Sequence, residues 1–153
     1  MYNHIKEIVA DSEKTGKPIS ELIIEQECQM SGLPREKVWN KMKYNLETMR
    51  DAVKKGRSGN GVFSSTGLTG GEAVKIKKYI EKGHTLSGDT IMTAVQNAVA
   101  TNEVNAAMGV ICATPTAGSS GTLPGVLFLL EKRLNLTEEQ MIHFLFTAGG
   151  LGM

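Results

Sequence analysis

The pattern VWNKMKYNLETMRDAV at residues 38–53 decides the fold class. Apolar side chains recur in it every three or four positions, which places them along one stripe of an α-helix. The members of this stripe are Val38, Met42, Leu46, Met49 and Val53. We therefore predict a long helix that packs the stripe on a core, with Trp39 beside it as a packing anchor.

The rest of the chain has the same helical period and lacks the alternating pattern of a β-strand, so we predict an all-α fold. Further helices are expected at about 3–15, 20–30 and 71–82, then from 87 or 89, from 126 to the sequence KRLN, and from the capping box TEEQ at 137–140. Ser20 and either Ser87 or Asp89 are the expected N-caps, and Pro34 suits the first turn of the long helix. The predicted buried face of the helix after residue 87 consists of Ile91, Val95, Ala98 and Val99.

Composition limits the class of function. The 153 residues suffice for one domain, and 17 basic against 16 acidic residues give a net charge of +1. No charge excess therefore favours nucleic acid or a membrane surface as a partner. No apolar run has the length of a membrane span, and the first residues lack the apolar core of a signal peptide. We expect Cys28 and Cys112 to be free thiols of a cytoplasmic protein, with Cys28 half-buried in its helix.

The composition changes at residues 56–71, GRSGNGVFSSTGLTGG. Glycine and serine allow a backbone to fold its N–H groups around an anion, and this segment leads into a predicted helix N-terminus. The same composition is typical of a flexible connector. Neither a Walker A sequence nor GxGxxG occurs, so nothing specific supports nucleotide binding. Both interpretations stay open, and the segment separates a helical layer at 1–55 from residues 72–153.

A second segment of this kind, GVICATPTAGSSGTLPGV, occupies residues 109–126. It places Cys112 between an apolar run and a cluster of proline, threonine, glycine and serine. The thiol could act as a nucleophile, as a metal ligand or as a small core residue. The histidines His4, His84 and His143 are distant in sequence, and no Cys or His follows at zinc-ligand spacing.

Polar residues in the preceding helix lie among alanines, which permit close helix packing. They are Asn97, Asn102, Glu103 and Asn105. Any of them that is buried needs hydrogen-bond partners.

Three longer motifs bear on the alternative roles of the Cys112 thiol and of the glycine-rich segments. They are GLTGGEAVKIKKYIEKGHTLSGDT, AVATNEVNAAMGVICATPTAGSSGTLPGV and MIHFLFTAGGLGM. In this order they resemble the alpha chain of the iron–sulfur-dependent bacterial L-serine dehydratases. ISELIIEQECQMSGLPREKVWNKMKYNLETM resembles the opening of that subunit, so the resemblance covers essentially the whole chain.

The resemblance implies deamination of L-serine to pyruvate and ammonia on a [4Fe–4S] cluster, without pyridoxal phosphate. The cysteine of the motif C-x-T-P-T-A-G is a cluster ligand in that family, a role that carries over to Cys112. Donors for the substrate carboxylate are expected in three segments that border one cleft. Their residues are Ser64, Ser65, Thr66 and Gly67, then Ser87, Gly88 and Asp89, and then Thr114, Pro115, Thr116, Ala117 and Gly118.

Other roles are less specific. Asn102 and Asn105 are candidates for orienting groups or for helix packing, and His84 is the candidate general base. The expected partners are L-serine, a regulatory beta chain or domain, and further copies in a homo-oligomer.

The resemblance also leads us to expect further cluster cysteines C-terminal to Cys112. Residues 1–153 are then the N-terminal part of a larger catalytic domain and inactive alone. Apolar area is expected to be exposed at Phe144, Phe146, Leu151 and Met153. The alternative is a stand-alone helical interaction or ligand-binding module in which Cys112 is a core thiol.

Overall fold

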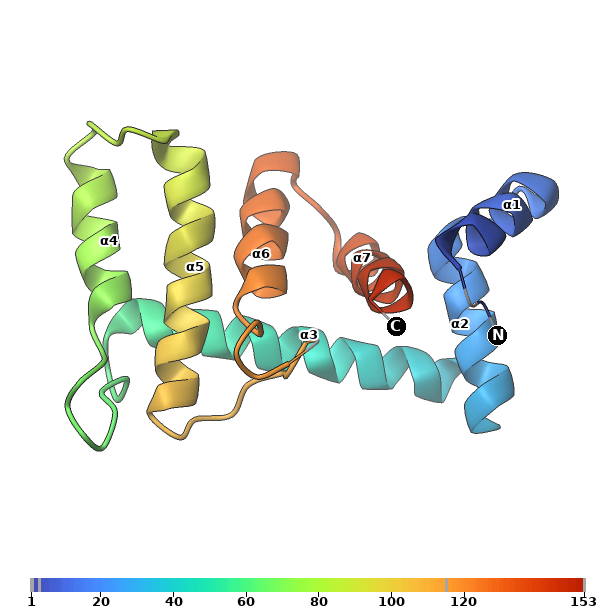
Figure 1. Cartoon of the computed structure of the whole chain (residues 1–153), viewed down its shortest axis with the longest axis horizontal. Helices are drawn as coiled ribbons and strands as arrows, with labels where there is room; N and C mark the ends of the chain where they lie inside the picture. The colour runs from blue at the N-terminus through green and yellow to red at the C-terminus, as the bar shows by residue number, and fades with distance from the viewer. Residues whose placement is uncertain (1, 3, 115, 153) are drawn as a thin grey trace. The chain divides into compact units, whose positions relative to one another are not determined.

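The computed structural model describes residue 2, residues 4–114 and residues 116–152. These residues form seven α-helices and no strand, which confirms the all-α fold class (Figure 1). The helices are α1 (Ile5–Thr15), α2 (Ile19–Ser31), α3 (Arg35–Ser58), α4 (Glu72–Glu81), α5 (Gly88–Ala106), α6 (Thr122–Leu134) and α7 (Glu138–Leu151). Among the described residues, no helix has the length and apolarity needed to span a membrane.

Two compact units divide the chain. The terminal unit comprises Met1–Leu46 and Thr137–Met153, and the middle unit comprises Glu47–Leu136. The long helix α3 contributes its first half to the terminal unit and its second half to the middle unit. Most of the predicted stripe is buried, at Val38, Leu46, Met49 and Val53. The stripe thus belongs to two cores rather than one.

In the terminal unit, α2 packs against α7 and α1 packs against α2. Trp39 of α3 is the packing anchor that the sequence predicts, because its ring lies 5.1 Å from the His143 ring and 6.1 Å from the Phe146 ring of α7. The expected exposure of Phe146 is wrong, since this packing leaves the side chain only 4% exposed. Leu151 is 43% exposed, as expected, and Phe144 is half-buried. Met153 lies outside the described residues.

The N-cap predicted at Ser20 is wrong. α2 begins at Ile19, and Ser20 is buried in its first turn with its hydroxyl 3.0 Å from Nδ1 of His143. A tertiary contact uses the hydroxyl that the prediction assigned to a local cap. The capping box at 137–140 is confirmed, because Thr137 and Gln140 each accept from the other's backbone N–H through their side chains.

Helices α4, α5 and α6 of the middle unit lie side by side in antiparallel order, and α5 contacts both neighbours (Figure 1). Glycines let backbones approach α5 closely. A Cβ added at Gly56 would lie 2.2 Å from the Ala100 carbonyl oxygen, and one at Gly121 would lie 2.4 Å from that of Ala98. The alanines of α5 thus permit the close packing expected of them.

The buried face of α5 differs from the predicted one. Ile91 and Val95 are 56% and 39% exposed, whereas the buried residues are Gln96, Asn97, Ala100, Thr101, Glu103 and Val104. Gln96 and Asn97 are stable at buried positions because they find hydrogen-bond partners. Gln96 donates to the Ala73 carbonyl at 3.1 Å, and Asn97 accepts from Arg57 at 3.4 Å. Apolarity alone misplaced Ile91 and Val95, whereas Ala98 and Val99 of the predicted face are half-buried and Ala98 packs closely against Gly121. Small residues and available hydrogen-bond partners decide which side of this helix packs.

Candidate functional site

The glycine-rich segment before α4 contains a closed turn. The Ser64 N–H donates to the Thr69 carbonyl at 2.9 Å, and the Gly67 N–H donates to the Ser64 carbonyl at 2.9 Å. The Ser64 hydroxyl accepts from the Thr69 N–H at 3.2 Å. The turn exposes Ser65, Thr66 and Gly67. These hydrogen bonds favour a shaped loop over a flexible connector.

Gly70 closes this turn in a conformation that only glycine tolerates well. Its φ is 135°, and an added Cβ would lie 2.7 Å from the Val62 carbonyl oxygen. Gly71 follows at φ 88° and precedes α4 as its N-cap. Two successive glycines therefore lead the chain from the turn into the helix.

Because Gly71 carries no side chain, α4 has no local side-chain cap. Glu103 of α5 takes that role from the neighbouring helix. Its Oε1 accepts from the backbone N–H groups of Glu72 and Ala73, the second at 3.3 Å. Unpaired N–H groups at a helix start need such acceptors. A side chain near the end of α5 thus caps the N-terminus of α4.

Two carboxyl groups meet at this point. Glu103 is 4% exposed, and its Oε2 is buried with no donor reaching it from the described part of the chain. Burial, followed by the side-chain hydrogen bond with Glu72, raises the pKa of Glu103 to about 7. The same hydrogen bond lowers the pKa of Glu72, whose Oε2 also accepts from the Gly70 N–H at 2.8 Å.

The loop after α5 starts with a helix-ending turn. The Gly109 N–H donates to the Val104 carbonyl at 2.8 Å, and Met108 adopts a left-handed φ of 60°. Ile111 then packs on a core cluster of Ala52, Val62 and Val104. Since Val62 belongs to the first glycine-rich segment, this cluster joins the two predicted loop segments at one end of α5.

Cys112 follows Ile111 as a half-buried free thiol. The Thr114 hydroxyl can donate to two atoms of Cys112. The carbonyl oxygen lies at 3.2 Å and the sulfur at 3.4 Å. Cys28, in α2, is likewise a half-buried free thiol, as expected.

The next turn is built from hydroxyl groups. The Ser119 N–H donates to the Thr116 hydroxyl at 3.3 Å, and the two hydroxyl oxygens are 3.0 Å apart. Thr116, Ala117 and Gly118 are exposed. Pro115 lies outside the described residues. The thiol is thus followed by two threonine hydroxyls, one half-buried and one exposed.

Ser87, Gly88 and Asp89 lie apart from these loops. α5 spans 19 residues from Gly88 to Ala106. This length corresponds to about 28 Å of helix between residues 87–89 and the loop that holds Cys112. The expectation that all three segments border one cleft is therefore wrong for 87–89 within this chain. The prediction grouped the segments by composition and did not count the length of the rigid helix between them.

The remaining predicted residues occupy separate positions. Ser87 precedes α5 without a side-chain cap, and Asp89 accepts from the Thr85 hydroxyl at 2.6 Å. His84 is exposed at the same end of α5, where its carbonyl accepts from the Tyr79 hydroxyl at 3.4 Å. Asn102 is exposed and Asn105 is half-buried.

The donor set fits only part of a cluster site. Across residues 4–114 and 116–152, no three side chains of His, Cys, Asp or Glu gather as they would around a metal ion. Iron–sulfur clusters are held by several thiolates. The middle unit offers Cys112, and Cys28 belongs to the terminal unit. Any cluster on Cys112 needs ligands beyond those that gather here.

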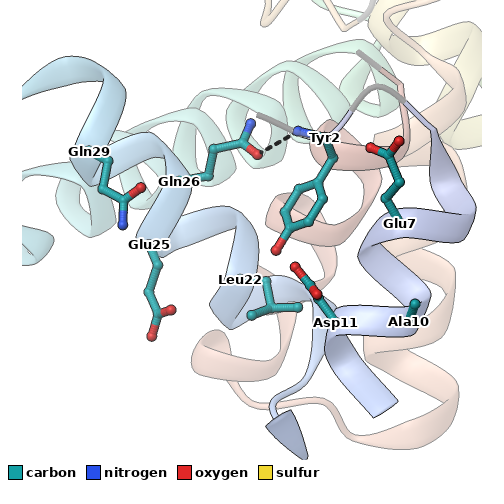
Figure 2. A pocket seen from close by; sticks show the side chains of 8 residues that line it. All are labelled: Tyr2, Glu7, Ala10, Asp11, Leu22, Glu25, Gln26 and Gln29. Carbon is teal, nitrogen blue, oxygen red and sulfur yellow. Dashed lines mark hydrogen bonds between the residues drawn. The ribbon is translucent and has the colours of Figure 1, made fainter. Parts of the chain in front are cut away.

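A cavity of about 560 Å³ lies between α1 and α2 in the terminal unit (Figure 2). Its lining consists of Tyr2, Glu7, Ala10, Asp11, Leu22, Glu25, Gln26 and Gln29. The Tyr2 N–H donates to Gln26 Oε1 at 3.3 Å, and burial together with a hydrogen bond to Asp11 raises the pKa of Tyr2. No residue predicted for the site lines this cavity.

Sequence reasoning identified Glu103 as a polar residue that needs partners, but it missed the pairing with Glu72. A signal for it was present in Gly70 and Gly71, which leave the following helix without a capping side chain. An acceptor from elsewhere in the chain is needed at such a helix start.

Comparisons with known proteins place the chain in a family. Residues 14–153 match the family model described as serine dehydratase alpha chain. The probable L-serine dehydratase alpha chain of Bacillus subtilis is 51% identical over 99% of this chain and 50% of its own length. The L-serine dehydratase alpha chain of Peptoniphilus asaccharolyticus is 30% identical over 99% of this chain and 52% of its own.

The L-serine dehydratase of Haemophilus influenzae is 26% identical over 99% of this chain and 34% of its own. The chain thus spans about half the length of the Bacillus and Peptoniphilus alpha chains. No solved structure gives a significant match. Because the family model covers nearly all of its residues, the chain belongs to the serine dehydratase alpha chain family.

Proposed function

We propose that this chain forms part of the active site of a cytoplasmic L-serine dehydratase, which deaminates L-serine to pyruvate and ammonia with a [4Fe–4S] cluster. The observation that carries the proposal is the similarity, along 99% of the chain, to proteins named L-serine dehydratase alpha chains. The loops at one end of α5 add support, because Ile111, which precedes Cys112, and Val62, which precedes the turn at 64–69, pack in the same core cluster.

Cys112 is the proposed cluster ligand. When bound, the cluster would supply a Lewis-acidic iron for the loss of the β-hydroxyl group of serine. The Thr114 hydroxyl lies 3.4 Å from the sulfur. A donor in this position stabilises a thiolate, and hydrogen bonds to ligand sulfurs tune a cluster.

The turns on either side of the core cluster are the proposed binding groups for the substrate carboxylate. Removal of the Cα proton increases the negative charge on that carboxylate, so donors placed there stabilise the transition state. The exposed candidate donors of the first turn are Ser65 and Thr66, whereas the Gly67 N–H is already bonded to the Ser64 carbonyl and keeps the turn closed. Those of the second turn are Thr116 and Gly118. They reach the substrate from two loops that meet at one end of α5.

Ser87, Gly88 and His84 have no part in this arrangement. They lie at the start of α5, about 28 Å of helix from its other end, so within one chain they do not reach the same serine molecule. The general base is therefore not among the residues that this proposal assigns.

The remaining cluster ligands and a regulatory beta chain or domain belong to the part of the protein that these residues do not include. The proposal requires at least two further cysteines in glycine-rich loops of the complete protein. Their absence would favour a helical binding module in which Cys112 is a core thiol.

Anaerobic reconstitution with iron and sulfide tests the proposal, followed by a visible absorption spectrum and a pyruvate assay with L-serine. The complete protein should turn brown and form pyruvate. The 153-residue chain alone should do neither, because too few thiolates gather around Cys112. A stable brown 153-residue chain that forms pyruvate would contradict the assigned ligands, and a complete protein that forms no pyruvate would contradict the reaction.

A further inference from the structure

The contact between Glu103 and the start of α4 bears on the turn that precedes this helix. We propose that Glu103 is a positioning residue for the turn at residues 64–69. Its protonated carboxyl group accepts from the N–H groups of Glu72 and Ala73 and donates to the Glu72 carboxylate. Because the turn is assigned to the substrate only in the proposed function, this role rests on that function.

The position of the proton follows from the burial of Glu103. The side chain is 4% exposed, and no donor from the described residues reaches its Oε2. A buried carboxylate oxygen without a donor is costly. A proton on Oε2 removes the charge and makes this atom a donor, for which the Glu72 carboxylate is the available acceptor.

Charges on the surrounding elements agree with this placement. Lys75 of α4 lies 4.0 Å from Glu72 Oε1, which favours the ionised form of Glu72. Arg57 of α3 donates to Asn97 at 3.4 Å and so is engaged elsewhere. The pKa of Glu103 is raised and that of Glu72 is lowered, as expected when Glu103 holds the proton.

Hydrogen bonds and short stretches of backbone together join Glu103 to the turn. Oε1 of Glu103 accepts from the Glu72 N–H, and Oε2 of Glu72 accepts from the Gly70 N–H at 2.8 Å. Gly70 directly follows Thr69, whose carbonyl closes the turn onto the Ser64 N–H at 2.9 Å. Loss of the Glu103 carboxyl group should therefore loosen the turn as well as the helix start.

Two variants distinguish a role of the protonated Glu103 carboxyl group from a role of its negative charge. Glu103→Gln keeps an acceptor and a donor at the positions of the two oxygens and removes the ability to ionise, whereas Glu103→Ala removes both. Glu81→Gln is the matched control, because Glu81 is exposed on α4 and pairs only loosely with Lys77 at 3.9 Å. All variants are made in the complete protein.

The first measurement is amide hydrogen exchange at residues 64–73. Glu103→Ala should speed exchange by about tenfold or more, because the bonds to the helix start are lost. Glu103→Gln should restore most of the protection, and Glu81→Gln should match the parent protein. Equal loss in Glu103→Gln and Glu103→Ala would overturn the protonated role. Unchanged exchange in Glu103→Ala would overturn the positioning role.

The second measurement is the kinetics with L-serine. Glu103→Ala should raise KM by about tenfold with a smaller change in kcat, because a loosened turn weakens binding of the carboxylate, and Glu103→Gln should recover most of the loss. Unchanged KM in Glu103→Ala would contradict the link to the substrate. If the parent protein forms no pyruvate, the proposed function fails, while hydrogen exchange still decides the role of the carboxyl pair.

A third measurement uses only the parent protein and does not depend on the folding of a variant. In the parent protein, the carboxyl carbon of Glu103 is followed by NMR as the pH is changed. Titration near neutral pH, well above that of ordinary glutamates, is expected. Titration in the ordinary range would overturn the protonated role.

Discussion

Glu103 makes the stability of the middle unit depend on pH. Burial is the main cause that raises its pKa from 4.5 to about 7. Because the pKa is higher in the folded state, the stabilisation by this group is complete below about pH 4.5 and is lost as the pH rises through about 7. We expect the free energy of unfolding to fall by about 1–3 kcal/mol over this interval. The lowered pKa of Glu72 acts below this interval, because its stabilisation is present above about pH 4.5 and is lost as the pH falls through the lowered pKa.

Chemical denaturation at a series of pH values measures this dependence. Glu103→Gln should flatten it, since the amide does not ionise, whereas Glu81→Gln should leave it as in the parent protein. A Glu103→Gln variant that keeps the full loss of stability between these pH values would show that another group causes it.

Met108 carries backbone strain at a position where its side chain is exposed. It adopts a φ of 60° at the end of α5, and its side chain is 90% exposed. Glycine reaches this conformation without the steric cost that other residues have. We expect Met108→Gly to raise the free energy of unfolding by about 0.5–1 kcal/mol, as measured by urea denaturation. A decrease would show that the methionine side chain contributes a stabilising contact.

At the scale of elements, the approach of α6 to α5 depends on Gly121. A Cβ at this position would lie 2.4 Å from the backbone oxygen of Ala98, which has no flexible end that could move aside. Gly121→Ala should therefore lower the free energy of unfolding by about 2–3 kcal/mol. At Gly118, in the same loop, the nearest atom would be the Thr116 hydroxyl at 4.0 Å, so Gly118→Ala should change stability by less than about 0.5 kcal/mol. Equal effects of the two substitutions would refute the close packing of these helices.

The helices themselves could be predicted from the sequence, because the apolar period and the capping box at 137–140 are local signals. The buried face of α5 could not, because Ile91 and Val95 look like core residues until the partners of Gln96 and Asn97 are known. Ser20 was misassigned for the same reason, since its partner His143 lies 123 positions away in the chain. Tertiary hydrogen bonds decide these cases, and a single sequence does not reveal them.

At the scale of the whole molecule, the family could be recognised from long motifs, and the comparisons confirm it. The placement of the loops shows which predicted groups share one end of α5. The sequence prediction also placed Ser87 and Gly88 at the substrate site, but the length of α5 separates them from Cys112. The chain spans about half the length of the Bacillus and Peptoniphilus alpha chains, so the complete site has to be tested in the complete protein.

The central claim is that Cys112 binds the iron–sulfur cluster on which serine is dehydrated. The most direct test compares Cys112→Ser with Cys28→Ser in the complete protein, because these are the two cysteines of the chain and both are half-buried. After anaerobic reconstitution, Cys112→Ser should lose the brown chromophore and pyruvate formation while its helical circular dichroism stays near that of the parent, since a hydroxyl replaces a thiolate poorly on iron. Cys28→Ser should keep both. A Cys112→Ser protein that binds the full cluster and forms pyruvate would contradict the claim.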